Sequence, residues 1–211
     1  MVAQILNSLI QKPYKPFLPK LLMVLSLISW IFILIIMLLA FIILIAIYYY
    51  NRFVILENRI DNSSAQIDVQ LKKRADLVPS LVKTVKGYVK HEKEIFDKIT
   101  KARSELIKSK NLGEKIKAGD LLQNFLGRLI AIAESNPQIR ANENFLNLQQ
   151  ELSAIEDKVA YARQFYNDSV LDYENASEKF PGVFFFKLYG RKKREFLKIS
   201  ETQRKMPEIE F

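Results

Sequence analysis

The stretch LLMVLSLISWIFILIIMLLAFIILIAIYYY, residues 21–50, decides the architecture of this chain. It holds no charged residue, and its strongly polar residues are Ser26 and Ser29. About 20 predominantly apolar residues in a helix are enough to cross a bilayer core, whereas a helix buried in a soluble core seldom needs so long a run. The stretch therefore predicts one transmembrane helix, with length to spare for tilt.

A cleaved signal peptide is the nearest alternative to an anchor. Such a peptide has a short apolar region followed by small residues at a cleavage site. Here the apolar run is long, and it ends in Tyr48, Tyr49 and Tyr50, followed by Asn51 and Arg52. Tyrosine is enriched at the boundary between membrane and water. We therefore expect an uncleaved anchor.

The two flanks of the run differ in charge. Residues 1–20 carry three lysines and three prolines, and proline at this density opposes helix formation, so we expect a flexible leader. Basic residues are enriched in the cytoplasmic segments beside a membrane helix, and the C-terminal flank carries more of them: Arg52, Arg59, Lys72, Lys73 and Arg74. We expect a single-pass protein of the plasma membrane with its downstream domain in the cytoplasm.

Residues 51–180 repeat apolar side chains at helical spacing, with almost no strand signals. The spacing predicts helices over 54–75, 79–109 and 119–134. Asn111-Leu112-Gly113 is interpreted as a helix stop, and Asn136-Pro137 as another. Pro79 either lies in the first turn of a helix that Asp76 caps or kinks a continuous helix.

The clearest helix follows Asn136-Pro137 and has a heptad seam. Its apolar residues alternate steps of three and four: Phe145, Leu148, Leu152, Ile155, Val159, Ala162 and Tyr166. Such a seam packs against neighbouring helices of a bundle, and Phe180-Pro181-Gly182 should end the helix. The prediction is an all-α fold, in which the N-terminal transmembrane helix precedes an antiparallel bundle of three to four long helices.

Several blocks of the sequence resemble the LemA family of bacterial membrane proteins, in order over residues 48–211. The blocks are Tyr50-Asn51-Arg52-Phe53-Val54, the run from Gln66 to Glu92, Leu126-Gly127-Arg128-Leu129, Ala141-Asn142-Glu143-Asn144-Phe145, the run from Ala160 to Asp168, and Pro207-Glu208-Ile209-Glu210-Phe211. The leader is longer than in that family, and Glu174 stands where the family pattern has Asn. The resemblance implies a helical bundle on a single anchor, and it implies no reaction.

The residues themselves show little that could carry catalysis, and we expect no enzyme activity, cofactor or metal. The single histidine, His91, stands among charged residues and is typical of a solvated helix position. The chain has no cysteine, so disulfides and thiolate metal sites are excluded. No glycine-rich phosphate loop is present. Asp61, Asp68, Arg74 and Asp76 are interpreted as a solvated face with local ion pairs, and the alternative is a partner-binding groove.

The tail, residues 181–211, combines aromatic and basic residues. Residues 179–205 carry nine basic and two acidic residues, whereas 51–178 are nearly balanced. Aromatic rings beside basic residues suit an anionic bilayer surface, and the candidates for this contact are Phe184, Phe185, Phe186, Arg191, Lys192, Lys193 and Arg194. The alternative is that the aromatic residues fold back and close the end of the bundle.

The expected function is that of a membrane-anchored interaction or scaffolding protein. Its partners would be the lipid bilayer and another protein or a second copy, with no nucleic acid and no small-molecule substrate. The first alternative is a membrane-organising protein that binds anionic lipid through the tail, because one branch of the LemA family acts in building magnetosome membranes. The second is an accessory regulator of a membrane peptidase, because family members also occur beside genes for such enzymes.

Overall fold

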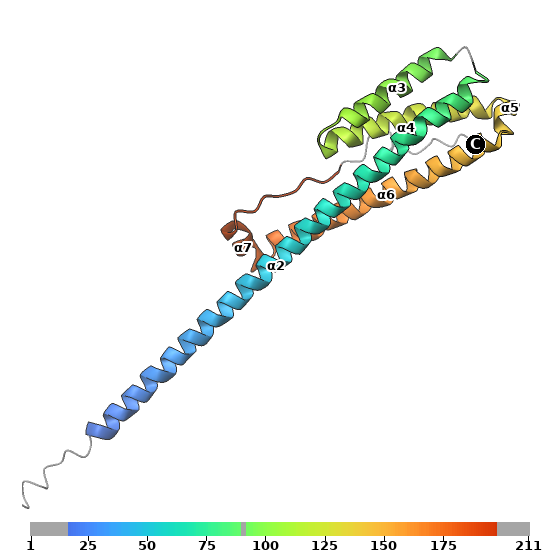
Figure 1. Cartoon of the computed structure of the whole chain (residues 1–211). Coiled ribbons are helices and arrows are strands. Elements are labelled where there is room, and N and C mark those ends of the chain that lie inside the picture. Colours follow the sequence, from blue (N-terminus) through green and yellow to red (C-terminus); the bar gives the residue numbers. More distant parts are fainter. Residues whose placement is uncertain (1–16, 90–91, 198–211) are drawn as a thin grey trace, which may run out of the picture. The chain divides into compact units, whose positions relative to one another are not determined.

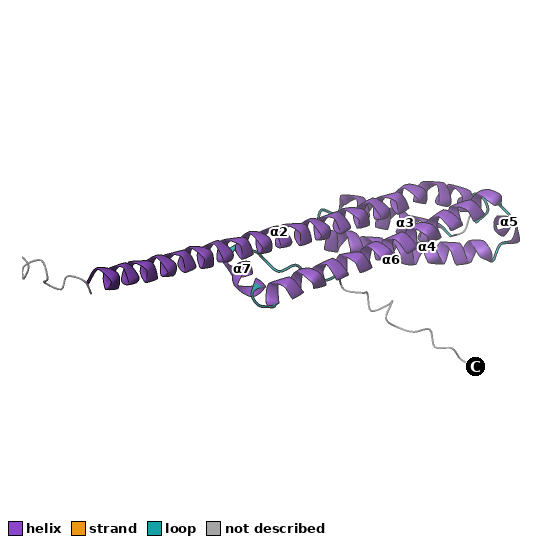
Figure 2. Ribbon diagram, turned by 90° about the horizontal axis from the view of Figure 1, so that it is seen from below, coloured by secondary structure: helices purple, strands orange, loops and turns teal. Residues whose placement is uncertain are grey.

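A computed structural model describes residues 17–89 and 92–197 of the chain (Figure 1). Within these ranges every regular element is a helix (Figure 2). The chain divides into two compact units, residues 1–51 and 52–211. The first helix, α2 (Phe17–Lys86), has residues in both units. The all-α prediction is confirmed.

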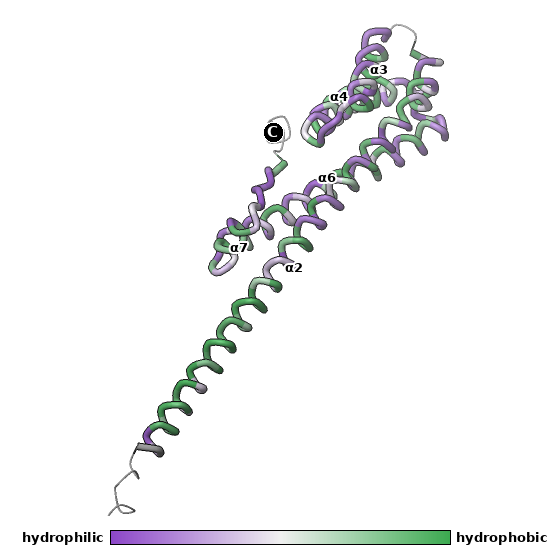
Figure 3. Tube along the Cα trace, turned by 60° about the vertical axis from the view of Figure 1, so that its left-hand side comes forward, coloured by the Kyte–Doolittle hydropathy of each residue, from purple (hydrophilic) through white to green (hydrophobic). Residues whose placement is uncertain are grey.

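The first unit consists, in its described part, of the N-terminal portion of α2. None of the residues from 19 to 51 is buried, although nearly all of them are apolar (Figure 3). By length and composition, α2 is the one helix in the described ranges that could cross a membrane. Over most of this portion the apolar side chains are exposed all around the helix, which matches the lipid environment that the uncharged stretch predicts.

The second unit is a bundle of four long helices. They are the remainder of α2, then α3 (Lys93–Lys108), α4 (Leu112–Glu134) and α6 (Glu143–Glu178). Phe53 contacts Tyr173 near the end of α6, and Asn142 at the start of α6 donates a hydrogen bond to Tyr88, just after α2. These pairs show that α2 and α6 are antiparallel. The neighbours α3 and α4 are joined by a short turn and lie side by side (Figures 1 and 2).

The heptad seam of α6 forms part of the bundle core. Phe145, Leu152, Val159, Ala162 and Tyr166 are buried, and Leu148 and Ile155 are half-buried. The seam continues beyond the predicted stretch through Val170 and Tyr173, which are fully buried. Facing them are the buried apolar residues of the other helices, which include Phe53, Ile60, Ile67, Leu71, Ile99, Leu122, Leu126 and Leu129.

Two helix boundaries differ from the predictions. The helix expected over 79–109 is divided, because α2 runs through Pro79 to Lys86 and α3 begins at Lys93. Pro79 therefore lies inside a continuous helix. α3 ends at Lys108, close to the end expected at 109. The side chain of Asn111 accepts a hydrogen bond from the Glu114 N–H and caps α4, which begins at Leu112 and not at the expected residue 119.

The other predicted stops are confirmed. α4 ends at Glu134, just before Asn136-Pro137, where Asn136 caps the short helix α5 (Pro137–Arg140). α6 ends at Glu178, just before Phe180-Pro181-Gly182, and the short helix α7 (Gly182–Leu188) follows. A non-helical segment, residues 191–197, comes after α7 and is here named the strap.

Candidate functional site

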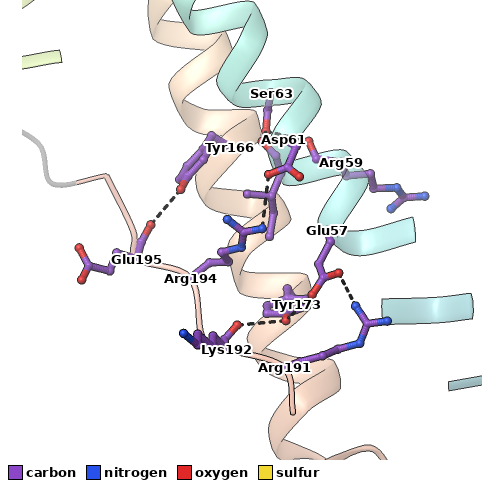
Figure 4. A network of polar contacts seen from close by, with 11 residues as sticks. Glu57, Arg59, Asp61, Ser63, Tyr166, Tyr173, Arg191, Lys192, Arg194 and Glu195 are labelled. Atoms are coloured by element: carbon purple, nitrogen blue, oxygen red, sulfur yellow. Dashed lines mark hydrogen bonds and ion pairs between the residues drawn. The ribbon is translucent and has the colours of Figure 1, made fainter. Parts of the chain in front are cut away.

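The strap lies against α2 and α6 through polar contacts. The Tyr166 hydroxyl donates to the Glu195 carbonyl (3.2 Å), and Arg194 is 3.5 Å from the Asp61 carboxylate (Figure 4). The side chain of Asn167 donates to the Leu197 carbonyl (3.2 Å) and accepts from the Leu197 N–H (2.8 Å). The bundle therefore already binds one extended segment of polypeptide through its backbone.

The start of the strap meets a cluster of aromatic and charged residues, the strap cluster: Phe53, Glu57, Tyr173, Phe186 and Arg191. The rings of Phe53, Tyr173 and Phe186 contact one another edge to face, with centroids 5.6 to 6.0 Å apart. The Arg191 guanidinium lies over the Phe53 ring, 5.6 Å from its centroid, and donates to Glu57. Packing and charge thus join α2, α6, α7 and the strap.

The pKa values in this cluster follow from its contacts. Burial by itself raises the pKa of Glu57. The hydrogen bonds from Arg191 and Tyr173, together with the charges of Arg191 and Arg194, lower the pKa by more than burial raises it, so the net shift is downward. Burial and the contact with Glu57 raise the pKa of the Tyr173 hydroxyl, which lies 2.9 Å from Glu57 Oε1. Glu57 is therefore ionised and Tyr173 neutral at physiological pH.

The residues predicted to touch lipid fall into different environments. Phe185 is buried and Phe186 is half-buried within the strap cluster, whereas Phe184 is exposed. Arg191, Lys193 and Arg194 pair with Glu57, Glu178 and Asp61 respectively. The Lys192 side chain is exposed, and its carbonyl lies 3.1 Å from the Tyr173 hydroxyl. Phe185 and Phe186 thus pack at the bundle's end, and lipid contact by any of the seven candidate residues stays a prediction.

A cavity of about 470 Å³ lies between α2, α4 and α6, beside the end of the described strap. Five of its charged and amide residues are named the cavity cluster, and three more also line it. The cavity cluster is Arg74, Asp120, Gln123, Glu156 and Arg163, and the other three are Gln164, Asn167 and Asp168. Its apolar walls are Ile116, Val159, Ala160 and Leu197. Such a mixture of apolar walls and a few convergent polar groups is typical of a binding site.

Charge in the cavity cluster is nearly balanced. Arg163 Nη2 donates to Asp120 Oδ1 at 2.5 Å, and Gln123 donates to the Glu156 carboxylate. Arg74 is almost completely buried, with 2% of its surface exposed, and its Nη1 reaches the Gly119 carbonyl at 3.4 Å. Burial lowers the pKa of Arg74, although Glu156 and Asp120 favour its charged form.

Several buried polar atoms of this cluster have no hydrogen-bond partner among the described residues. They are two donors, Arg74 Nε and Arg163 Nε, and one acceptor, Gln123 Oε1. A buried polar atom without a partner is unfavourable by about 1–3 kcal/mol. A ligand that supplies both acceptors and a donor would satisfy these atoms.

The prediction of a solvated face on α2 was wrong for Arg74. Asp76 is exposed, and Asp68 accepts from Lys115 of α4, as expected of surface positions. Arg74 instead stands three residues after Leu71 and four before Val78, and both of these are buried. This spacing puts Arg74 on the same apolar helix face as Leu71 and Val78, and that was the signal in the sequence that could have revealed its burial.

Candidate metal ligands were sought among the described residues. In the two described ranges, no group of three or more His, Asp or Glu side chains is placed to hold a metal ion. His91 lies outside these ranges, as do the leader up to residue 16 and the block Pro207–Phe211. The cavity cluster offers binding chemistry through hydrogen bonds and charge.

Comparison with known proteins extends the resemblance found in the sequence. Residues 63–211 match the LemA family. Magnetosome protein MamQ from Magnetospirillum gryphiswaldense is 25% identical over 173 residues, which cover 70% of this chain and 64% of MamQ. Protein LemA from Metamycoplasma hominis is 26% identical over 134 residues, which cover 60% of this chain and 61% of that protein. The chain therefore spans less than two thirds of these relatives.

Proposed function

This chain belongs to the LemA family, and we propose that it is a membrane-anchored, non-catalytic interaction or scaffolding protein. The uncharged portion of α2 anchors it in the plasma membrane, and the bundle binds a partner polypeptide on the cytoplasmic side. The cavity cluster, with its buried and incompletely bonded Arg74, is the observation that carries the proposal.

An extended polypeptide is the ligand class that best fits the cavity. Its carbonyls would accept from Arg74 Nε and Arg163 Nε, and its N–H groups would donate to Gln123 Oε1. Because the cluster's own charges nearly balance, an uncharged main chain fits better than a strongly charged ion. Asn167, which also lines the cavity, already bonds both backbone groups of Leu197 in this manner.

Photo-crosslinking in native membranes tests the proposal. A photoreactive amino acid replaces Gln164, which lines the cavity, and in a control it replaces Ile107 on the exposed face of α3. We expect a discrete adduct from position 164 that is lost when Ala160→Trp fills the cavity. An adduct of twice the chain's mass would identify a second copy as the partner. Equal adducts from both positions, or an adduct that survives Ala160→Trp, would contradict the proposal.

The cytoplasmic location is tested by labelling, which the absence of native cysteine makes simple. Tyr161→Cys places a thiol at a position that is 70% exposed on α6. We expect a membrane-impermeant maleimide to label it in inverted vesicles and not in intact cells. Labelling in intact cells would place the bundle outside.

A second candidate function is that of a membrane-organising protein, favoured by the exposed apolar residues of α7. This function requires the bundle itself to contact lipid, in addition to the anchor. The third alternative, regulation of a membrane peptidase, stays a prediction.

A further inference from the structure

Three large apolar side chains around α7 face away from the protein. Phe180 is 88% exposed, Phe184 is 61% exposed and Leu188 is 63% exposed. Phe184 and Leu188 are four residues apart within α7 and share one face of that helix, and Phe180 lies in the turn just before it. We name them the α7 stripe. A solvent-exposed apolar stripe of this kind usually marks a contact with another molecule or a membrane.

The opposite side of α7 is held firmly by the bundle. Phe185 is buried and stacks on Tyr189, with ring centroids 6.1 Å apart. Phe186 contacts both Phe53 and Tyr173. Because these neighbours fix the orientation of α7, the stripe cannot turn inward without breaking the strap cluster.

The length of the chain places this region near the anchor, whatever the angle between the two units. Phe53, which contacts α7 through Phe186, follows Tyr50 at the end of the apolar run by three residues. Three residues span at most about 11 Å even when fully extended. A membrane that contains residues 21–50 therefore has its surface close to α7.

Basic residues accompany the stripe. Three lysines have exposed side chains: Lys179 just before the stripe, Lys187 within it and Lys192 after it. The nearby acidic residue Glu178 pairs with Lys193. Lysines beside aromatic and aliphatic side chains are typical of a helix that lies in the headgroup region of an anionic bilayer.

We propose that α7 is an interfacial helix whose stripe, Phe180, Phe184 and Leu188, inserts into the anionic surface of the same bilayer that holds the anchor. This inference rests on the proposed anchor. Arg191 and Arg194 do not provide the lipid contact, because both are paired with carboxylates of α2. The contact gives the bundle a second attachment to the membrane, in addition to the anchor.

Fluorescence quenching in proteoliposomes tests the insertion, using full-length protein in mixed neutral and anionic lipid. The environment-sensitive dye NBD is attached to a single cysteine in Phe184→Cys or Leu188→Cys. A third variant, Tyr161→Cys, is a matched control on the exposed surface of α6. Nitroxide-bearing lipids are expected to quench most of the fluorescence at positions 184 and 188 and little at 161. Lys179→Gln with Lys187→Gln, or neutral lipid alone, should reduce this quenching.

A fourth variant, Leu34→Cys, separates failure of this inference from failure of the anchor, since Leu34 lies in the apolar run. Quenching at 34 without quenching at 184 and 188 would overturn the interfacial helix and leave the anchor intact. Absence of quenching at 34 would overturn both. Unchanged helicity by circular dichroism shows that each variant is folded.

Discussion

The strap cluster and the cavity cluster both combine arginines with carboxylates, but among the described residues they differ in how much of the space around the charges is filled. In the strap cluster, the Glu57 carboxylate accepts hydrogen bonds from Arg191 and Tyr173, and three aromatic rings fill the surrounding space. In the cavity cluster, Arg74 has one long hydrogen bond and borders about 470 Å³ of space. Side chains of the protein itself fill the space around the strap cluster, whereas the open space beside the cavity cluster is the reason it is proposed as a binding site.

Tyr173→Ala should have the largest effect, because it removes a fully buried ring from the strap cluster. Loss of a buried aromatic side chain reduces the unfolding free energy by about 3–5 kcal/mol. Tyr173→Phe keeps the ring and should reduce it by about 1 kcal/mol. Urea unfolding of the full-length protein in detergent, read by protease resistance, measures both variants. Equal losses would show that packing does not dominate this cluster.

The two arginines of the cavity cluster should respond differently to replacement by methionine. Arg163→Met leaves the Asp120 carboxylate without its 2.5 Å partner, and we expect a loss of about 1.5–3 kcal/mol of unfolding free energy. Arg74→Met replaces a buried charge that has one long bond, so the change should stay within about 1 kcal/mol. The same urea assay applies. A larger loss of unfolding free energy for Arg74→Met would mean that the cavity cluster, like the strap cluster, mainly stabilises the fold.

Two glycines of α4 test how tightly the helices meet beside the cavity. A Cβ at Gly119 would lie 2.7 Å from Leu71 Cδ2, which is buried, whereas a Cβ at Gly127 would meet nothing within 4 Å. Gly127→Ala should therefore stabilise the bundle by about 0.5–1 kcal/mol. Gly119→Ala has the same advantage in helix propensity, but its methyl group would clash with Leu71, which should reduce the unfolding free energy by about 1–3 kcal/mol. Thermal unfolding of both variants should show shifts of opposite sign.

The smallest expected effect is the pH dependence of the strap cluster. The pKa of Glu57 is lower in the folded chain than the ordinary value of 4.5. Its contribution to stability is therefore present above the ordinary value and is lost as the pH falls through the folded value. Glu57→Gln should cost no more than about 1 kcal/mol at neutral pH, because solvent screens this partly exposed group.

Urea unfolding near neutral pH and in acid compares the Glu57→Gln variant with the unmodified protein. The difference between the two should disappear in acid. A difference that persists there would mean that the carboxylate's charge is not what holds the strap.

The sequence predicted the long elements well because each carries a strong local pattern. The seam from Phe145 to Tyr166 and the stop at Phe180-Pro181-Gly182 were both correct. The break after Lys86 and the cap at Asn111 were missed, because Gly and Asn occur both after helices and before them. The cavity cluster was not predicted as a unit, since its residues come from three helices that are distant in sequence; of its members only Arg74 was considered for a partner-binding groove.

Two features were determined by the sequence alone: a segment suited to lipid on every side, and helices with one apolar face each. Both depend on the order of residues within one helix, so no neighbour is needed to recognise them. Only the tertiary structure decided the burial of three consecutive phenylalanines: Phe184 is exposed, Phe185 is buried and Phe186 is half-buried. Consecutive residues of a helix point about 100° apart, so which ring enters the core depends on where Phe53 and Tyr173 stand.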